Sequence, residues 1–171
     1  TYEEYIAMLD WSTEQREHPV AIRVPGAVIH GEKPTKDYGI LNKYETVQKG
    51  SGAAIIALGT FFGMGKQAAE LIEKKTGVKP TLINPVYITG IDEELLESLK
   101  KDHKAVVTLE DGILDGGFGE KIARFYGDSD MRTVNFGLKK EFLDRYDANE
   151  VLRQNGITPE QIADRAAELV K

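Results

Sequence analysis

Short apolar runs alternate with amphipathic segments from residue 44 to the end of this chain, and this alternation restricts its fold more than any other feature. Apolar runs at 53–58, 81–83, 105–109 and 133–136 predict strands, and the segments between them have the apolar spacing of helices. Strands that alternate with helices pair in parallel through right-handed crossovers. The pattern therefore predicts a three-layer α/β/α fold, in which helices cover both faces of a mostly parallel sheet.

A fifth strand and several helix boundaries complete this prediction. The run at 44–48 precedes a Gly-containing turn, so we expect it to form an antiparallel hairpin with 53–58 at the edge of a five-stranded sheet. Gly77 is a typical C-terminal stop, Asp92 a typical N-cap and Thr158 a typical helix start. We expect helices over 64–76, from 92, up to 126, over 141–146 and 150–154, and from 159 onward.

The first 41 residues lack this alternation. Thr1 and Glu4 have the spacing of a capping box and predict a helix, and the apolar run 20–24 predicts one strand. One helix and one strand cannot bury both of their faces. We therefore interpret residues 1–24 as the tail of a preceding domain, 25–41 as a linker and 42–171 as the main domain. Thr1 in place of a starting methionine predicts that the chain is part of a longer protein.

The composition excludes several classes of site. The chain has no cysteine, so it has no disulfide, thiolate zinc site or cysteine nucleophile. Its 22 basic and 28 acidic residues give a net charge of −6, which argues against nucleic acid and anionic membranes as partners. The three histidines lack metal-ligand spacing, and we expect His103 on a solvated helix end. We expect no metal site, no complete catalytic site in this fragment, and a cytoplasmic location.

Two glycine-containing segments are candidates for ligand binding. The string at 63–68 resembles a dinucleotide-binding turn, but it is separated from its strand and lacks an acidic partner about 20 residues on, so we expect packing on the sheet instead. The second segment follows a strand end. It consists of Glu110, Asp111 and a loop that contains Gly116, Gly117 and Gly119.

This second segment has two interpretations. Adjacent acids at the carboxyl end of a parallel strand can bind a metal or a partner. Alternatively, Asp115 caps the next helix and the glycines permit close packing. Arg23, inside the apolar run at 20–24, also has two interpretations: an edge-strand ion pair, or a binding residue for phosphate or carboxylate.

Five segments, taken in order, resemble one enzyme family. They are HPVAIRVP at 18–25, AAIIALGT at 53–60, IDEELLESL at 91–99, AVVTLEDGILDGGFGE at 105–120 and NFGLKKEF at 135–142. Together they are similar to the C-terminal end of 1-deoxy-D-xylulose-5-phosphate synthases and their relatives in the transketolase superfamily. The most specific of them is the T-x-E strand end that GG-x-G follows.

The resemblance implies a parent enzyme of three domains. Residues 1–24 would end its pyrimidine-binding domain, and 42–171 would be its C-terminal domain, which serves dimerisation and shapes the substrate entrance. The parent would use thiamine diphosphate and Mg²⁺ to join pyruvate to glyceraldehyde 3-phosphate with loss of CO₂, for isoprenoid and thiamine synthesis. The cofactor motifs lie outside this chain, so we expect the fragment to bind no cofactor. Its expected partners are a second copy and the missing N-terminal domains.

The resemblance assigns one site residue, and the sequence departs from the family near it. Arg23 matches an arginine that helps to hold the phosphorylated substrate, but Val24 and Gly26 replace the tyrosine and the second arginine of R-Y-P-R-G. Val86 stands where the family has another phosphate-binding arginine. Loss of one such contact costs about 1.5–3 kcal/mol. A paralogue with another acceptor, a transketolase subunit, an E1-type 2-oxo acid dehydrogenase β subunit and a non-catalytic regulatory or binding domain are the alternatives.

Overall fold

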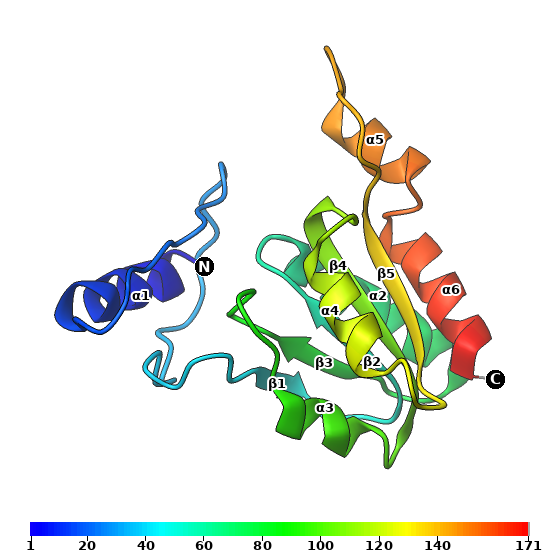
Figure 1. The fold of residues 1–171 in the computed structure, drawn as a ribbon. Coiled ribbons are helices and arrows are strands. Elements are labelled where there is room, and N and C mark those ends of the chain that lie inside the picture. The colour runs from blue at the N-terminus through cyan, green and yellow to red at the C-terminus, as the bar shows by residue number, and fades with distance from the viewer. Residues whose placement is uncertain (171) are drawn as a thin grey trace. The chain divides into compact units, whose positions relative to one another are not determined.

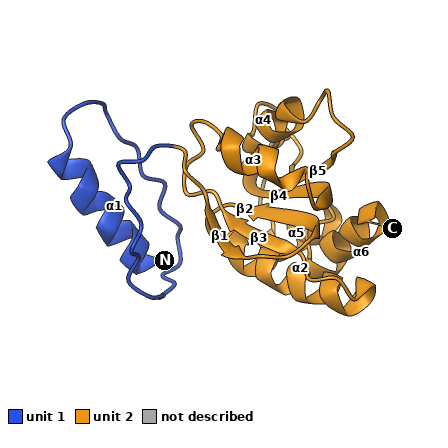
Figure 2. Ribbon diagram, turned by 90° about the horizontal axis from the view of Figure 1, so that it is seen from below, with its two compact units in different colours: residues 1–41 blue, residues 42–171 orange. Residues whose placement is uncertain are grey.

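The computed structural model describes residues 1–170 and has two compact units, Thr1–Leu41 and Asn42–Lys171 (Figure 2). The first unit contains α1 (Tyr2–Glu14), and the Thr1 hydroxyl accepts the backbone N–H of Glu4 at 3.2 Å as the capping box predicts. Among the described residues of α1, none is buried. The strand expected at 20–24 is wrong, because these residues have no regular secondary structure. A single extended segment without a neighbouring strand has no ladder to satisfy its backbone.

The described part of the second unit contains a five-stranded sheet in the order β1-β3-β2-β4-β5. The parallel strands and the antiparallel edge strand agree with the prediction. The strands are β1 (Glu45–Gln48), β2 (Gly52–Ala57), β3 (Thr81–Asn84), β4 (His103–Ile113) and β5 (Arg132–Leu138).

The predicted hairpin between 44–48 and 53–58 is wrong. β1 pairs with β3, and β2 lies between β3 and β4. β2 is buried along nearly all of its length, so it occupies the centre of the sheet, where parallel neighbours satisfy both of its edges. The turn between β1 and β2 passes the start of β3, since the N–H of Ser51 donates to the carbonyl of Lys79 at 2.9 Å.

Helices cover both faces of the sheet and complete three layers (Figure 1). The helices of this unit are α2 (Phe61–Thr76), α3 (Glu93–Leu99), α4 (Phe118–Phe125), α5 (Ala148–Gln154) and α6 (Pro159–Val170). Ile55 and Ala57 of β2 face the core under α2 and α6, whereas the alternate residues Ala54 and Ile56 face the core under α3 and α4. α2 ends at Thr76, and Gly77 follows it with a φ of +74°, the left-handed conformation expected of a C-terminal stop.

The helix expected at 141–146 does not form, because residues 139–147 have no regular secondary structure. A helix of six residues is unstable without tertiary packing, and Phe142 and Tyr146 are exposed. Across the described part of the chain, no helix is both long and apolar enough to cross a bilayer.

Candidate functional site

The carboxyl ends of β2 and β4 lie side by side where the connections of the sheet diverge. The chain leaves β2 toward α2 on one face and leaves β4 toward α4 on the other (Figure 1). Open parallel sheets hold their ligands at such a divergence. Beyond β2, the N–H of Leu58 donates to the carbonyl of Leu109 at 2.9 Å. Glu110 and the loop after it therefore occupy the place where a site is expected.

The Glu110 carboxylate caps the start of α4. Its side chain is buried, and its two oxygens accept the backbone N–H groups of Phe118 at 2.8 Å and Gly119 at 3.0 Å. A helix N-terminus presents unpaired N–H groups and a partial positive charge, so a carboxylate stabilises it. Glu110 thus joins the end of a strand to the start of the next helix.

Gly116, Gly117 and Gly119 each meet a different requirement of this turn. Gly116 has a φ of +72°, and its N–H donates to Glu120 at 3.0 Å. A Cβ at Gly117 would collide with the Glu110 carboxylate. A Cβ at Gly119 would lie 2.6 Å from the Thr108 hydroxyl oxygen. The glycines therefore let α4 start close to the strands.

Two parts of the sequence interpretation change here. Asp115 does not cap α4, because Gly117 is the N-cap and no side chain of the cap residue bonds to the helix. Glu110 takes that role from eight residues upstream of Phe118. Asp111 is exposed beside it. Within residues 1–170, no three acidic or histidine side chains converge on a position that fits a metal ion.

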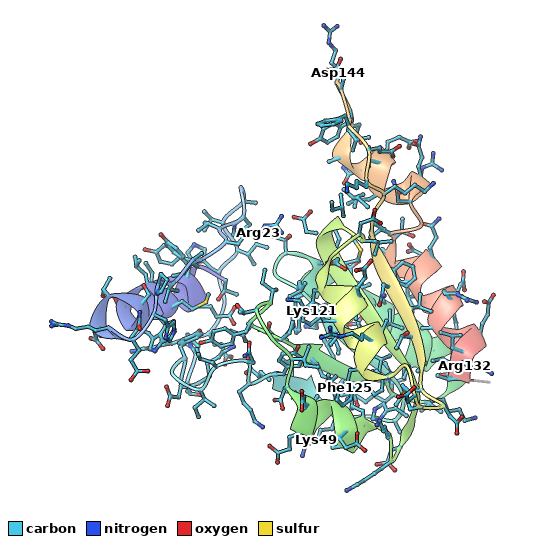
Figure 3. All side chains as sticks on the ribbon, viewed as in Figure 1. Arg23, Lys49, Lys121, Phe125, Arg132 and Asp144 are labelled. Carbon is cyan, nitrogen blue, oxygen red and sulfur yellow. The ribbon has the colours of Figure 1, made fainter. Side chains whose placement is uncertain are left out.

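A second loop at this end of the sheet is tied to α4. Nζ of Lys121 donates to the carbonyls of Ile88 at 2.7 Å and Thr89 at 3.1 Å, which lie between β3 and α3 (Figure 3). The same loop contains Val86, whose φ is +60°. This backbone conformation is costly for a β-branched residue. No sequence pattern indicates these contacts of Lys121, since a lysine on a helix is usually solvated.

Arg23 lies in the first unit and the 110–119 loop lies in the second. The Arg23 side chain is exposed, in a segment without regular secondary structure (Figure 3). The structure brings Glu110 together with Gly117 and Gly119. Arg23 belongs to a different compact unit from these three residues.

His103 was expected on a solvated helix end, and this is wrong. It begins β4, with Nε2 2.8 Å from the Thr81 hydroxyl and Nδ1 3.0 Å from the Leu99 carbonyl. Its burial lowers its pKa below 6.5. It lines a cleft of about 670 Å³ at the amino ends of the strands. Charged side chains of both signs line this cleft, so it lacks a single charge preference. They are Lys100, Lys104, Arg132, Asp128 and Asp130.

Comparisons with known proteins agree on one family. Residues 42–162 match the family described as the C-terminal domain of transketolase. The 1-deoxy-D-xylulose-5-phosphate synthase of Shouchella clausii is 32% identical over 150 residues, which are 85% of this chain and 24% of that protein. The synthase of Clostridium tetani is 30% identical over 171 residues, which are 98% of this chain and 27% of that protein. This chain therefore spans about a quarter of the length of these relatives.

Solved structures share the fold. A split-gene transketolase, described as an inactive β4 tetramer, has a TM-score of 0.66 at 22% identity and covers 76% of this chain and 44% of its own. Transketolase from Pichia stipitis has a TM-score of 0.52 at 21% identity and covers 75% of this chain and 18% of its own.

Proposed function

Since this chain belongs to the family of transketolase C-terminal domains, we propose that it is the C-terminal region of a thiamine-diphosphate enzyme that acts as a 1-deoxy-D-xylulose-5-phosphate synthase. The observation that carries this proposal is the extent of the similarity. The alignment with the Clostridium tetani synthase covers 98% of the chain, whereas the C-terminal domain match begins at residue 42. The first unit therefore has its counterpart in the synthases too.

The first unit supports a boundary inside a larger protein. α1 has apolar side chains at Tyr2 and Leu9 that are exposed, and none of its described residues is buried. An amphipathic helix gains most of its stability by packing its apolar face. We propose that residues 1–24 close the pyrimidine-binding domain of the parent, that 25–41 are a linker, and that 42–171 contribute to a homodimer and to the substrate entrance.

In the parent, thiamine diphosphate held with Mg²⁺ would stabilise the carbanion formed from pyruvate. The residues of this chain would instead bind and orient the acceptor. Arg23 would hold the phosphate of glyceraldehyde 3-phosphate by charged hydrogen bonds. Val86 offers no such group at the position of the second family arginine, which favours weaker phosphate binding. We further propose a cytoplasmic enzyme that supplies isoprenoid precursors. A transketolase is the second candidate, because the family that matches residues 42–162 is described as the C-terminal domain of transketolase.

Arg23→Ala in the full-length parent tests the proposal. We expect KM for glyceraldehyde 3-phosphate to rise about tenfold or more, as the loss of a charged hydrogen bond predicts. KM for pyruvate is expected to stay the same, because pyruvate has no phosphate. Arg16→Ala is the matched control, since Arg16 is an exposed arginine of the same unit.

The outcomes separate the site from the activity. An unchanged KM for the phosphorylated acceptor would remove Arg23 from the site. A parent that forms no 1-deoxyxylulose 5-phosphate from the two substrates would overturn the activity itself. The isolated chain is expected to bind no thiamine diphosphate in calorimetry, and micromolar binding would contradict the assignment of the cofactor residues to the rest of the parent.

A further inference from the structure

Residues 139–147, which we name the arm, project from the sheet domain between β5 and α5. Figure 3 shows Asp144 at the outer end of this segment, beyond the helices that cover the sheet. The arm carries three large apolar side chains that are exposed. Phe142 has a relative exposure of 108%, Tyr146 of 60% and Leu143 of 37%.

These three side chains lie close together in sequence on a segment without regular secondary structure. Single exposed apolar residues are common, but three on one short segment indicate a surface that another part of a protein covers. Within the second unit, no described residue covers Phe142, since its exposure there is complete. The charges on the arm are mixed: Lys139, Lys140 and Arg145 are balanced by Glu141 and Asp144. This balance does not favour nucleic acid or an anionic membrane as the occupant.

We propose that the arm is a docking element that binds the part of the parent polypeptide upstream of Thr1. The inference rests on the proposed function, because it needs a longer parent. The relatives indicate how long such a parent is. The Clostridium tetani alignment covers 27% of that synthase, so most of such a protein lies outside the region of this chain.

The size of the apolar surface favours the parent's own upstream chain over a second copy that binds through the arm alone. A fully exposed aromatic side chain can bury roughly 150–250 Å². Tyr146 and Leu143 are already partly covered, so the three side chains together offer well under about 800 Å². A stable interface between separate proteins buries about 800 Å² on each partner. Within one polypeptide the covalent connection gives an effective concentration of about millimolar, so a smaller contact suffices.

Limited trypsin cleavage of the full-length parent tests the arm directly. Lys139, Lys140 and Arg145 provide cleavage sites within it. We expect the arm to be cut at least about tenfold more slowly in the parent than in the isolated chain, because docking hides it. Phe142→Ser in the parent is expected to restore rapid cleavage. Val47→Ser is the matched control, since Val47 is 52% exposed on the edge strand β1 and lies outside the arm.

Each outcome bears on the inference. In the isolated chain, both variants are expected to have the melting temperature of the wild type. A lower melting temperature there would reveal a folding defect. Equally rapid cleavage of parent and isolated chain overturns the proposal. Protection that appears only as the parent concentration rises assigns the arm to a second copy and also overturns it. An inactive parent with a protected arm refutes the proposed activity alone, whereas an active parent with an unprotected arm refutes only the docking.

Discussion

At the scale of single residues, Glu110 determines how the chain turns from β4 into α4. Its carboxylate accepts two backbone N–H groups from the first turn of α4 in a buried position. We expect Glu110→Ala to lower the free energy of unfolding by about 2 kcal/mol, because two buried donors lose a charged acceptor. Glu110→Gln keeps one acceptor oxygen and is expected to cost about half as much. Urea unfolding of the chain measures both.

Asp115→Ala is the control for this prediction, since Asp115 lies in the same loop and does not cap the helix. It is expected to change the free energy of unfolding by less than about 0.5 kcal/mol. An equal loss for Asp115→Ala and Glu110→Ala would contradict the assignment of the cap.

His103 predicts a pH dependence of stability. Burial lowers its pKa in the folded state below 6.5, so between the two pKa values the unfolded state binds more protons. Stability from this group is therefore complete above 6.5 and is lost as the pH falls toward the folded pKa. The hydrogen bond with the Leu99 carbonyl and the charge of Asp102 oppose this lowering of the pKa. Lys100, Lys104 and Arg132 line the same cleft with Asp128 and Asp130.

Melting temperatures at about pH 7.5 and about pH 5.5 measure this effect. We expect the chain to melt at a lower temperature at the lower pH, and His103→Asn to reduce the difference. Glu3, Glu4 and Glu150 have pKa values below 4.5 through hydrogen bonds, so they titrate at lower pH. An unchanged difference in the variant would show that another group is responsible.

Single residues also show how far the sequence predicts the candidate site. The pattern at 110–119 located the loop, because apolar strand ends and glycine clusters are local signals. The capping role of Glu110 was not predictable, since it depends on a carboxylate and N–H groups that only the completed turn brings together. The contacts of Lys121 with the loop at 88–89 follow from tertiary structure in the same way.

At the scale of elements, the two glycines near the start of α2 differ in the space that surrounds them. A Cβ at Gly65 would lie 2.8 Å from the Ala57 Cβ in β2, whereas a Cβ at Gly63 meets nothing within 4 Å. We expect Gly65→Ala to destabilise the chain by about 1–3 kcal/mol through overpacking. Gly63→Ala is expected to stabilise it by about 0.5–1 kcal/mol, because alanine favours the helix.

The two variants are each other's control in chemical unfolding, since both replace a glycine of one helix by alanine. Equal effects would show that helix propensity alone acts and that α2 does not need close contact with β2. A loss for Gly65→Ala together with a gain for Gly63→Ala would support the sequence interpretation of 63–68 as packing on the sheet.

The elements that sequence predicted correctly are those whose burial is continuous. β2 and β4 have long buried runs, so their apolar patterns are strong. The predicted partner of β1 was wrong. β1 pairs with β3, which lies far along the chain, so no local pattern indicates this pairing. The expected elements at 20–24 and 141–146 did not form because apolar residues alone supply no neighbour to pack against.

At the scale of the whole molecule, the two units differ in how they can be stable. Unit Asn42–Lys171 contains both apolar cores, one on each face of the sheet. Unit Thr1–Leu41 has a helix of 13 residues without a buried residue among those described. A helix of this length is marginal in water without packing. The difference predicts that the second unit folds alone and that the first does not.

Separate expression of residues 42–171 and of residues 1–41 checks this prediction. We expect residues 42–171 to melt cooperatively within about 2 °C of the whole chain, because the domain keeps its cores. Residues 1–41 are expected to give a circular dichroism spectrum of a largely unfolded peptide, since the partner of α1 would lie in the pyrimidine-binding domain of the parent. A folded peptide, or a loss of several degrees in the shortened chain, would contradict the separation. It would mean that residues 1–41 stabilise this domain rather than belong to its upstream neighbour.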